Sequence, residues 1–313
     1  MVRPLSAGLI AGAALGVAWV AARRYGRGRA DQILDWEQIR SIAVRASSAN
    51  GPLSADERTS IEEAYTRLVR DIAEPVAAYT GTGLTLAETE VRALDRPEWI
   101  DANISNFRDL LQPFEQLYRE AANPGRFDLP GVTAVGRLLL SGELGFLLGY
   151  LSRRVLGQYD ISLLGARATE PGKLYFIEPN IRAVQQQLAL PDREFRVWLA
   201  LHETTHAHEF EGHPWVRDYL NTTLQDYLGS MVDALRDGAG ERVRGSGALT
   251  ATAQFVSRAA DRLALGGTLL EAIMTPQQRE LVSRLQALMC LLEGYSNHVM
   301  QVVGQTLLPH FAE

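Results

Sequence analysis

Apolar residues recur at intervals of three and four along most of the chain, which is the spacing of one face of an α-helix. The first such stretch follows residue 31 and runs through Trp36, Ile39 and Ile42. A second begins near Ser54, and Pro75 is expected to kink or end it, because proline removes a helical hydrogen bond. The same spacing predicts further helices over residues 100–122, 134–156, 192–211, 214–235, 251–265 and 276–306.

Two short runs of β-favouring residues interrupt the helical pattern. They cover residues 159–164 and 173–178, and they are separated by Gly165 and by Pro171-Gly172, residue types that are common in turns. The two runs therefore predict one small β-hairpin. The predicted fold class is mainly α, with one helical domain over residues 31–313 that contains this hairpin, preceded by an apolar N-terminal helix.

The first 30 residues differ from the rest of the chain. Residues 5–22 carry no charge, and Gly8, Gly12 and Gly16 stand four apart before Arg23 and Arg24. Such a stretch is close in length to the shortest helix that spans a bilayer. Arginines that follow it favour a cytoplasmic location for the rest of the chain, residues 31–313, which we call the body. We therefore expect residues 1–30 to be a membrane anchor and linker, whose glycine face permits self-association. Two alternatives stay open: a signal peptide with an exported body, or an apolar helix packed on a soluble cytoplasmic body.

The balance of charge and the single cysteine narrow the chemistry. The chain has 31 Lys and Arg against 37 Asp and Glu, a net charge of −6, and five of the arginines lie in the first 30 residues. The body is therefore acidic and does not fit nucleic acid, which needs a basic face. Cys290 has no cysteine partner in the chain and is expected in the core, so a metal site would use histidine and carboxylate ligands.

Four of the six histidines fall within twelve residues, and two of them frame the string His202-Glu-Thr-Thr-His206. This is the HExxH pattern, and it lies inside a predicted helix for which Asp192 is the expected N-cap. Side chains four apart stand one turn above each other, so both histidines can bind the same zinc ion. Glu203 points about 100° away from His202 around the helix axis. There it can act as a general base on a zinc-activated water.

A catalytic zinc usually has three protein ligands, so a third is needed. Glu293 is the preferred candidate, because it follows the apolar run 288–292 and a cation would stabilise a buried carboxylate. Asn297, one turn further, is expected to orient a ligand histidine. His213 is the alternative third ligand; otherwise it and His208 are interpreted as surface residues. Glu209 lies about 10 Å along the helix from the first histidine, too far to share the ion.

Further motifs accompany the histidines over residues 31–309: Asp35-Trp36, Thr80-Gly81, Leu94-Asp-Arg-Pro-Glu-Trp99, Leu156-Gly-Gln-Tyr159, Pro179-Asn180, Trp198-Leu-Ala-Leu-His-Glu-Thr-Thr-His206, Phe210, Pro214-Trp215 and Met289-Cys-Leu-Leu-Glu-Gly294. With these motifs the sequence resembles a family of zincin-like, zinc-dependent metallohydrolases, often labelled as associated with deazaflavin coenzyme biosynthesis. The resemblance implies a mostly helical zincin-like fold, zinc on the HExxH helix, and peptidase or other hydrolase activity. The label indicates no substrate.

The sequence therefore predicts a zinc metallopeptidase that acts on peptides or proteins. One zinc per chain is expected on His202, His206 and Glu293, with Glu203 as the general base. The hairpin is a candidate for aligning the substrate by backbone pairing. The candidates for stabilising the oxyanion are Tyr219, Tyr295 and His298. A second hypothesis is a membrane-tethered scaffold or binding protein with a structural or vestigial zinc site. Hydrolysis of a non-peptide amide would use the same groups as peptide hydrolysis.

Overall fold

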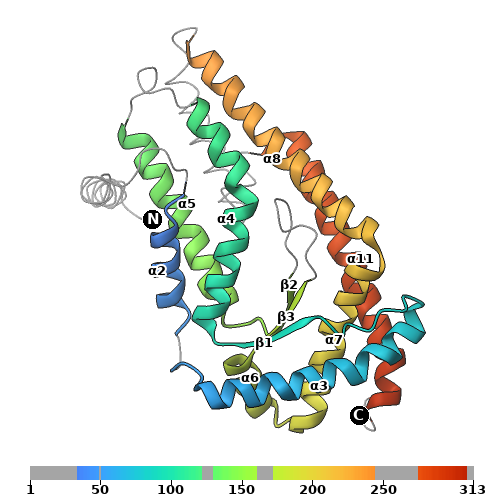
Figure 1. The fold of residues 1–313 in the computed structure, drawn as a ribbon. Coiled ribbons are helices and arrows are strands. Elements are labelled where there is room, and N and C mark those ends of the chain that lie inside the picture. Colours follow the sequence, from blue (N-terminus) through green and yellow to red (C-terminus); the bar gives the residue numbers. More distant parts are fainter. Residues whose placement is uncertain (1–33, 49–50, 122–129, 161–171, 244–273, 309–313) are drawn as a thin grey trace, which may run out of the picture. The chain divides into compact units, whose positions relative to one another are not determined.

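The computed structural model describes residues 34–48, 51–121, 130–160, 172–243 and 274–308 (Figure 1). The elements in chain order are α2 (Trp36–Ala46), α3 (Ala55–Thr80), β1 (Glu90–Leu94), α4 (Arg96–Ala121), α5 (Pro130–Leu151), β2 (Gly157–Asp160), β3 (Lys173–Ile177), α6 (Glu178–Leu188), α7 (Asp192–Gly212), α8 (Pro214–Val243) and α11 (Pro276–Leu307). The predicted mainly helical fold class is confirmed.

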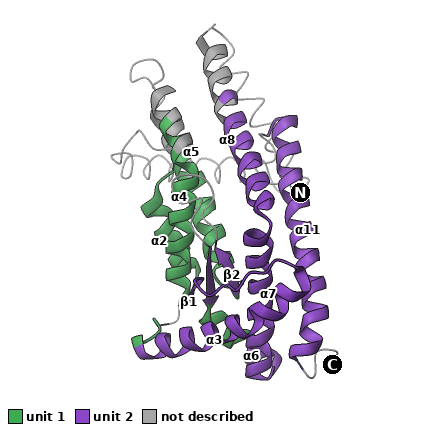
Figure 2. Cartoon of the chain, turned by 45° about the vertical axis from the view of Figure 1, so that its right-hand side comes forward, with its two compact units in different colours: residues 1–55, 93–156, 177–184 green, residues 56–92, 157–176, 185–313 purple. Residues whose placement is uncertain are grey.

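The chain divides into two compact units, which Figure 2 colours separately. Unit 1 comprises residues 1–55, 93–156 and 177–184, and unit 2 comprises residues 56–92, 157–176 and 185–313. The predicted single domain over residues 31–313 stays a prediction.

Unit 1 is built around the packing of α2 against α5. Asp35 caps α2 by accepting a hydrogen bond from the N–H of Gln38 at 3.0 Å. The N–H of Asp35 donates to the hydroxyl of Ser141 in α5 at 2.9 Å. Gly149 allows the two helices to approach closely, because a Cβ there would lie 2.7 Å from the carbonyl oxygen of Ala43.

The contacts at the start of α4 explain two of the short sequence motifs, residues 94–99 and Pro179-Asn180. The N–H of Glu98 donates to the Asp95 carboxylate and the N–H of Asp95 donates to the Glu98 carboxylate, both at 2.9 Å, which is a capping box. Arg96 donates to the side-chain oxygen of Asn180 at 2.8 Å. The amide nitrogen of Asn180 donates in turn to two carbonyl oxygens that follow α5. These motif residues therefore hold unit 1 together.

The three strands form one sheet in the order β1-β3-β2, so β2 lies at an edge. β2 and β3 pair antiparallel, with Gly157 opposite Phe176 and Tyr159 opposite Leu174, which confirms the predicted hairpin pairing. β2 begins two residues before the predicted run, and residues 161–171 lie outside the described residues. The sequence does not predict β1, because its five residues are too short a run to show a clear alternation.

In unit 2, α7 packs against α8, α11 and strand β2. The three helices share a buried apolar cluster of Phe210, Val216, Leu220, Leu288 and Leu292. Helix α3 continues through Pro75 to Thr80, so this proline does not end the helix. The ring of Tyr65 in α3 stacks on that of Phe176 in β3, with 3.8 Å between the ring centroids.

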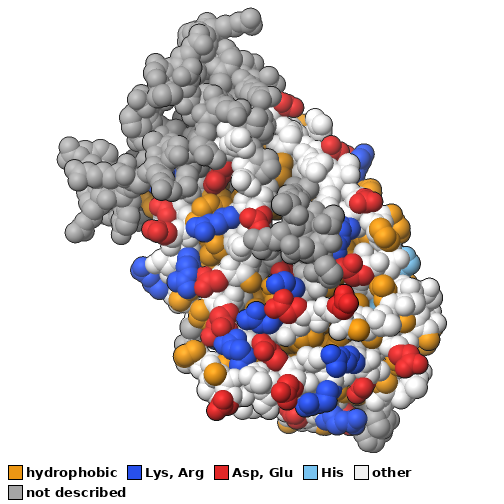
Figure 3. All heavy atoms as spheres, viewed as in Figure 1, with side chains coloured by type: hydrophobic (Ala, Val, Ile, Leu, Met, Phe, Trp, Pro, Cys, Tyr) orange, Lys and Arg blue, Asp and Glu red, His pale blue; other side chains and the backbone are white. Residues whose placement is uncertain are grey.

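Two predicted segments lie outside the described residues: the apolar residues 5–22, with Gly8, Gly12 and Gly16, and the helix over residues 251–265. Among the helices that the structure describes, none has both the length and the apolar character to cross a membrane. The anchor and its self-association stay predictions. On the face drawn in Figure 3, acidic and basic side chains are interspersed over the described residues.

Candidate metal centre

Helix α7 carries the HExxH motif, residues 202–206, within its length of 21 residues. Its N-cap is Pro191, one residue before the predicted Asp192, and the cap makes no side-chain hydrogen bond. Asp192 instead lies in the first turn and pairs with Arg196 at 2.9 Å. Residues such as Leu199 and Leu201 are buried and fix the rotation of the helix. The motif therefore sits on a rigid element, as the sequence predicts.

The imidazole rings of His202 and His206 converge on one point. Their Nε2 atoms lie 3.2 Å apart, and Oε1 of Glu293 in α11 lies 3.7 Å from Nε2 of His206. One ligand atom from each of the three residues lies within 4.8 Å of the other two. Two nitrogens at 2.0–2.1 Å from a tetrahedral zinc would be separated by about 3.3 Å. Two imidazoles and one carboxylate in this arrangement therefore fit a zinc ion.

Glu293 lies beside His206, but its carboxylate is not buried as the sequence analysis expects. Its side chain is 51% exposed, so the argument from a buried carboxylate is wrong, although the position next to His206 is as expected. His213 caps the C-terminal end of α7. It is not a member of the converging group found among the described residues.

The second ring nitrogen of His206 is held by a buried carboxylate. Oε2 of Glu209 lies 2.7 Å from Nδ1 of His206, and Glu209 is only 2% exposed. A carboxylate on the outer nitrogen fixes the tautomer and the orientation of a metal-binding histidine. The sequence reasoning missed this role because it considered Glu209 only as a direct ligand. The spacing of three residues on one helix was the available signal.

The second ring nitrogen of His202 has neutral neighbours. The hydroxyl of Ser296 and the sulfur of Met300, both on α11, each lie 3.2 Å from Nδ1 of His202. The predicted partner Asn297 is exposed on α11. On its other side, the His202 ring lies parallel to the indole of Trp198, with 6.1 Å between centroids.

The carboxylate of Glu203 is buried against strand β2. Glu203 is 4% exposed, and a Cβ on Gly157 would collide with its carboxylate, so a larger residue at 157 would displace the Glu203 side chain. Burial raises the pKa of Glu203 to about 7, and a hydrogen bond from the N–H of Tyr159 acts in the opposite direction. The carboxylate is therefore poised to exchange a proton near neutral pH.

The pKa values of the two converging histidines shift in opposite directions. Burial, followed by the charge of His206, lowers the pKa of His202 to about 4. Burial also acts to lower the pKa of His206, but the hydrogen bond and charge of Glu209, together with the charges of Glu203 and Glu293, outweigh it, so the pKa of His206 is raised. A neutral imidazole on His202 is the form that binds a metal ion.

Two other sequence interpretations are wrong. His208 is 1% exposed, with its Nδ1 2.7 Å from the hydroxyl of Thr82, and is not a surface residue. Cys290 is exposed on α11 rather than a core residue. Among the oxyanion candidates, Tyr219 is 42% exposed on α8 and Tyr295 is partly buried. Nε2 of His298 is hydrogen-bonded to the hydroxyl of Tyr79 in α3, at 2.8 Å.

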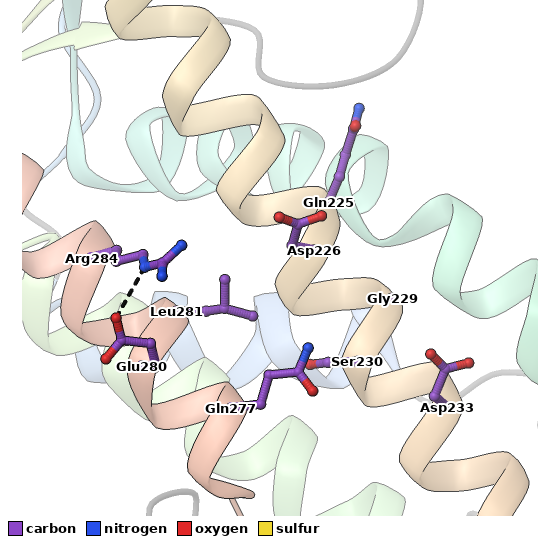
Figure 4. A pocket seen from close by; sticks show the side chains of 9 residues that line it. All are labelled: Gln225, Asp226, Gly229, Ser230, Asp233, Gln277, Glu280, Leu281 and Arg284. Atoms are coloured by element: carbon purple, nitrogen blue, oxygen red, sulfur yellow. Dashed lines mark hydrogen bonds and ion pairs between the residues drawn. The ribbon is translucent and has the colours of Figure 1, made fainter.

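A hollow of about 490 Å³ lies between α8 and α11, away from the histidines. Figure 4 shows its polar lining, which includes Asp226, Ser230 and Asp233 from α8. From α11, Glu280 and Arg284 pair with each other at 3.1 Å. The residues that converge at the histidine motif do not line this hollow.

Comparisons with known proteins identify the family of the chain. A family model described as zincin-like metallopeptidase matches residues 34–313. A solved structure from Chloroflexus aurantiacus, described as a candidate hydrolase with a novel fold, is 37% identical, with a TM-score of 0.60. The match covers 89% of this chain and 72% of that one. No curated protein matches the chain. Both matches support a hydrolase, and the chain belongs to the zincin-like metallopeptidase family.

Proposed function

We propose that the protein is a zinc-dependent metallopeptidase. His202, His206 and Glu293 hold one zinc ion per chain, and Glu203 is the general base. The observation that carries the proposal is the convergence of two imidazole nitrogens and one carboxylate oxygen within 4.8 Å, with the buried Glu203 carboxylate on the same helix. Three ligands and a neighbouring acid are the parts that zinc-assisted hydrolysis needs.

The donor set favours a catalytic site over a structural one. A structural zinc is usually closed by four protein ligands, whereas the converging group among the described residues supplies three. A zinc ion held there would supply a Lewis acid, which polarises a carbonyl group and makes a water molecule acidic enough to lose a proton near neutral pH. A scaffold with a structural zinc would require a fourth protein ligand and is less well supported by this geometry, whereas a vestigial site would differ only in its lack of turnover.

Glu203 moves the proton. Its ionised carboxylate can accept a proton from the attacking water. The same group can then deliver that proton to the leaving amine. The carboxylate is buried against strand β2, so little of it is open to solvent.

Strand β2 is suited to align an extended peptide. It is one of the two edge strands of the sheet, and its Gly157 lies against the Glu203 carboxylate. A peptide that pairs with an edge strand is held by main-chain hydrogen bonds, which are independent of the peptide's side chains. This favours a peptide over a small amide, although both would use the same zinc and base.

The test uses the zinc-loaded full chain and a library of internally quenched peptides with varied central residues. Glu203→Gln is expected to keep one zinc per chain and to lower turnover by about a thousandfold, since general base catalysis is worth about 10²–10⁴. Glu194→Gln, in the first turn of the same helix, is the matched control and should retain turnover. Retained turnover in Glu203→Gln, or a wild-type chain that takes up no zinc, would refute the proposal.

A further inference from the structure

Glu211, in the last turn of α7, receives hydrogen bonds from three separate segments of unit 2. Its Oε1 accepts from Arg217 of α8 at 2.6 Å and from the N–H of Gly172 at 3.2 Å. The third donor is the hydroxyl of Tyr159 in β2. A charged acceptor binds each donor more strongly than a neutral one. We call these four residues the Glu211 network.

Tyr159 is fixed within this network. Burial, and then the hydrogen bond to Glu211, raise the pKa of Tyr159, so its hydroxyl stays protonated and donates. Its ring packs on that of Phe210, with 5.9 Å between centroids. A Cβ built on Gly172 would lie 2.3 Å from the Tyr159 hydroxyl oxygen, so the main chain before β3 can press against the phenol only because residue 172 is glycine.

The main chain of the same tyrosine reaches the proposed base. The N–H of Tyr159 donates to Glu203, and Gly157, two residues earlier, lies against the Glu203 carboxylate. Glu203 and Glu211 are eight residues apart on α7, which is about 12 Å along the helix axis. Tyr159 therefore connects the two carboxylates, with its hydroxyl on one and its N–H on the other.

We propose that Glu211 is a positioning residue for Glu203: by holding the Tyr159 hydroxyl it fixes strand β2 across α7 and thereby fixes the Glu203 carboxylate. The inference rests on the proposed function where it concerns Glu203 as the base. Its structural part, the restraint of β2 by Glu211, can be measured without any substrate. Glu211 itself touches neither a candidate zinc ligand nor Glu203 in the contacts described above.

Two variants and one matched control test the inference in the full, zinc-loaded chain. Tyr159→Phe removes only the hydroxyl, and Glu211→Ala removes the acceptor. The control is Tyr65→Phe, because Tyr65 is also buried in unit 2 and its hydroxyl accepts from Arg196 at 2.8 Å. Amide hydrogen exchange is measured by mass spectrometry on peptides that contain residues 157–160. The values of kcat and KM are measured on the internally quenched peptide that the wild type cleaves best.

Tyr159→Phe and Glu211→Ala are expected to speed exchange in β2 about tenfold, because a charge-assisted hydrogen bond no longer restrains the strand. They are also expected to lower kcat about tenfold at unchanged KM and zinc content, since a misplaced base affects the reaction rather than binding. Glu211→Gln keeps a side-chain oxygen and should restore part of both. Tyr65→Phe should change neither.

Unchanged exchange in β2 would overturn the inference. If Tyr159→Phe and Glu211→Ala show faster exchange in β2 but have the same kcat as the control Tyr65→Phe, the connection between Glu211 and Glu203 is overturned. If the wild type cleaves no peptide, the proposed function fails, whereas faster exchange in both variants would still support the restraint of β2 by Glu211. The two failures are therefore distinguishable.

Discussion

His206 and His208 are two residues apart on α7, yet they have opposite properties. Both are largely buried, and both have a partner 2.7 Å from Nδ1: a carboxylate oxygen of Glu209 for His206, and the hydroxyl of Thr82 for His208. Burial acts to lower both pKa values, but Glu209 outweighs it for His206, whose pKa is raised, whereas the pKa of His208 falls to about 4. The group facing Nδ1, rather than burial, decides whether positive charge is stabilised at the ring.

The direction of each ring separates the two residues further. Two positions on a helix differ by about 200°, so the rings leave opposite sides of α7. Nε2 of His206 meets His202 and Glu293, whereas Nε2 of His208 is buried without a hydrogen-bond partner among the described residues. Histidines that are close in sequence therefore do not all lie at one site.

The strongest test of this comparison is zinc affinity. His206→Ala is expected to weaken zinc binding about a thousandfold, since a zinc site worth about 12 kcal/mol loses one of its few ligands. His208→Gln should change the affinity less than threefold, because its ring points away from the site. Competition with a chromophoric chelator measures both. Equal losses in the two variants would mean that the rings do not differ in the way their directions indicate.

The difference between His206 and His208 also shows which features of the site can be predicted from the sequence and which cannot. The fixed spacing of a helix predicts that the rings of His202 and His206 converge, and their Nε2 atoms lie 3.2 Å apart. His208 was misjudged because its partner Thr82 lies 126 residues away in the chain, and no local pattern reveals that contact. The expected burial of Glu293 is wrong, since its neighbours in sequence are apolar but its own side chain is half exposed, and its role as a zinc ligand stays a prediction.

The fold shows the same limit. Helix boundaries near strong caps agree with the sequence: α11 begins at Pro276 after a capping box at Thr275, where the pattern predicts it. Strand β1 was missed because its pairing with β3 depends on residues some 80 positions away, and five residues carry little periodicity. Interactions within one helix were predictable, and those between distant segments were not.

The stability of the protein at acid pH tests the lowered pKa of His208. His208 titrates near 6.5 when unfolded and at about 4 when folded, so falling pH protonates the unfolded state first and favours unfolding. Its contribution is fully present above pH 6.5 and is lost as the pH falls towards 4. Between pH 7 and pH 4.5 the wild type should lose about 2–3 kcal/mol more unfolding free energy than His208→Gln.

Urea denaturation at the two pH values measures this difference. The two proteins differ only at residue 208, so comparing their pH-dependent losses of stability isolates His208. A variant that loses as much stability as the wild type would show that His208 is charged in the folded protein and that its environment resembles that of His206.

Substitutions of Glu209 and Thr82 test whether the Nδ1 partners of His206 and His208 act separately. Glu209→Gln keeps the shape but removes the charge that faces Nδ1 of His206, and it is expected to weaken zinc binding by about 10–100-fold. Thr82→Val removes the corresponding partner of His208 and should leave zinc affinity unchanged. The same chelator competition applies. If Thr82→Val weakened zinc binding as much as Glu209→Gln, the two Nδ1 partners would not act separately.

The smallest effect is expected at the other converging histidine, where the partner of Nδ1 is neutral. Ser296 lies 3.2 Å from Nδ1 of His202, and Met300 lies at the same distance. Removing one neutral hydrogen bond costs about 1 kcal/mol, so Ser296→Ala should weaken zinc binding only about two- to fivefold. Because the sulfur of Met300 still faces the ring, His202 keeps its orientation. A loss as large as that of Glu209→Gln would contradict the conclusion that a carboxylate holds a ligand histidine more firmly than a hydroxyl does.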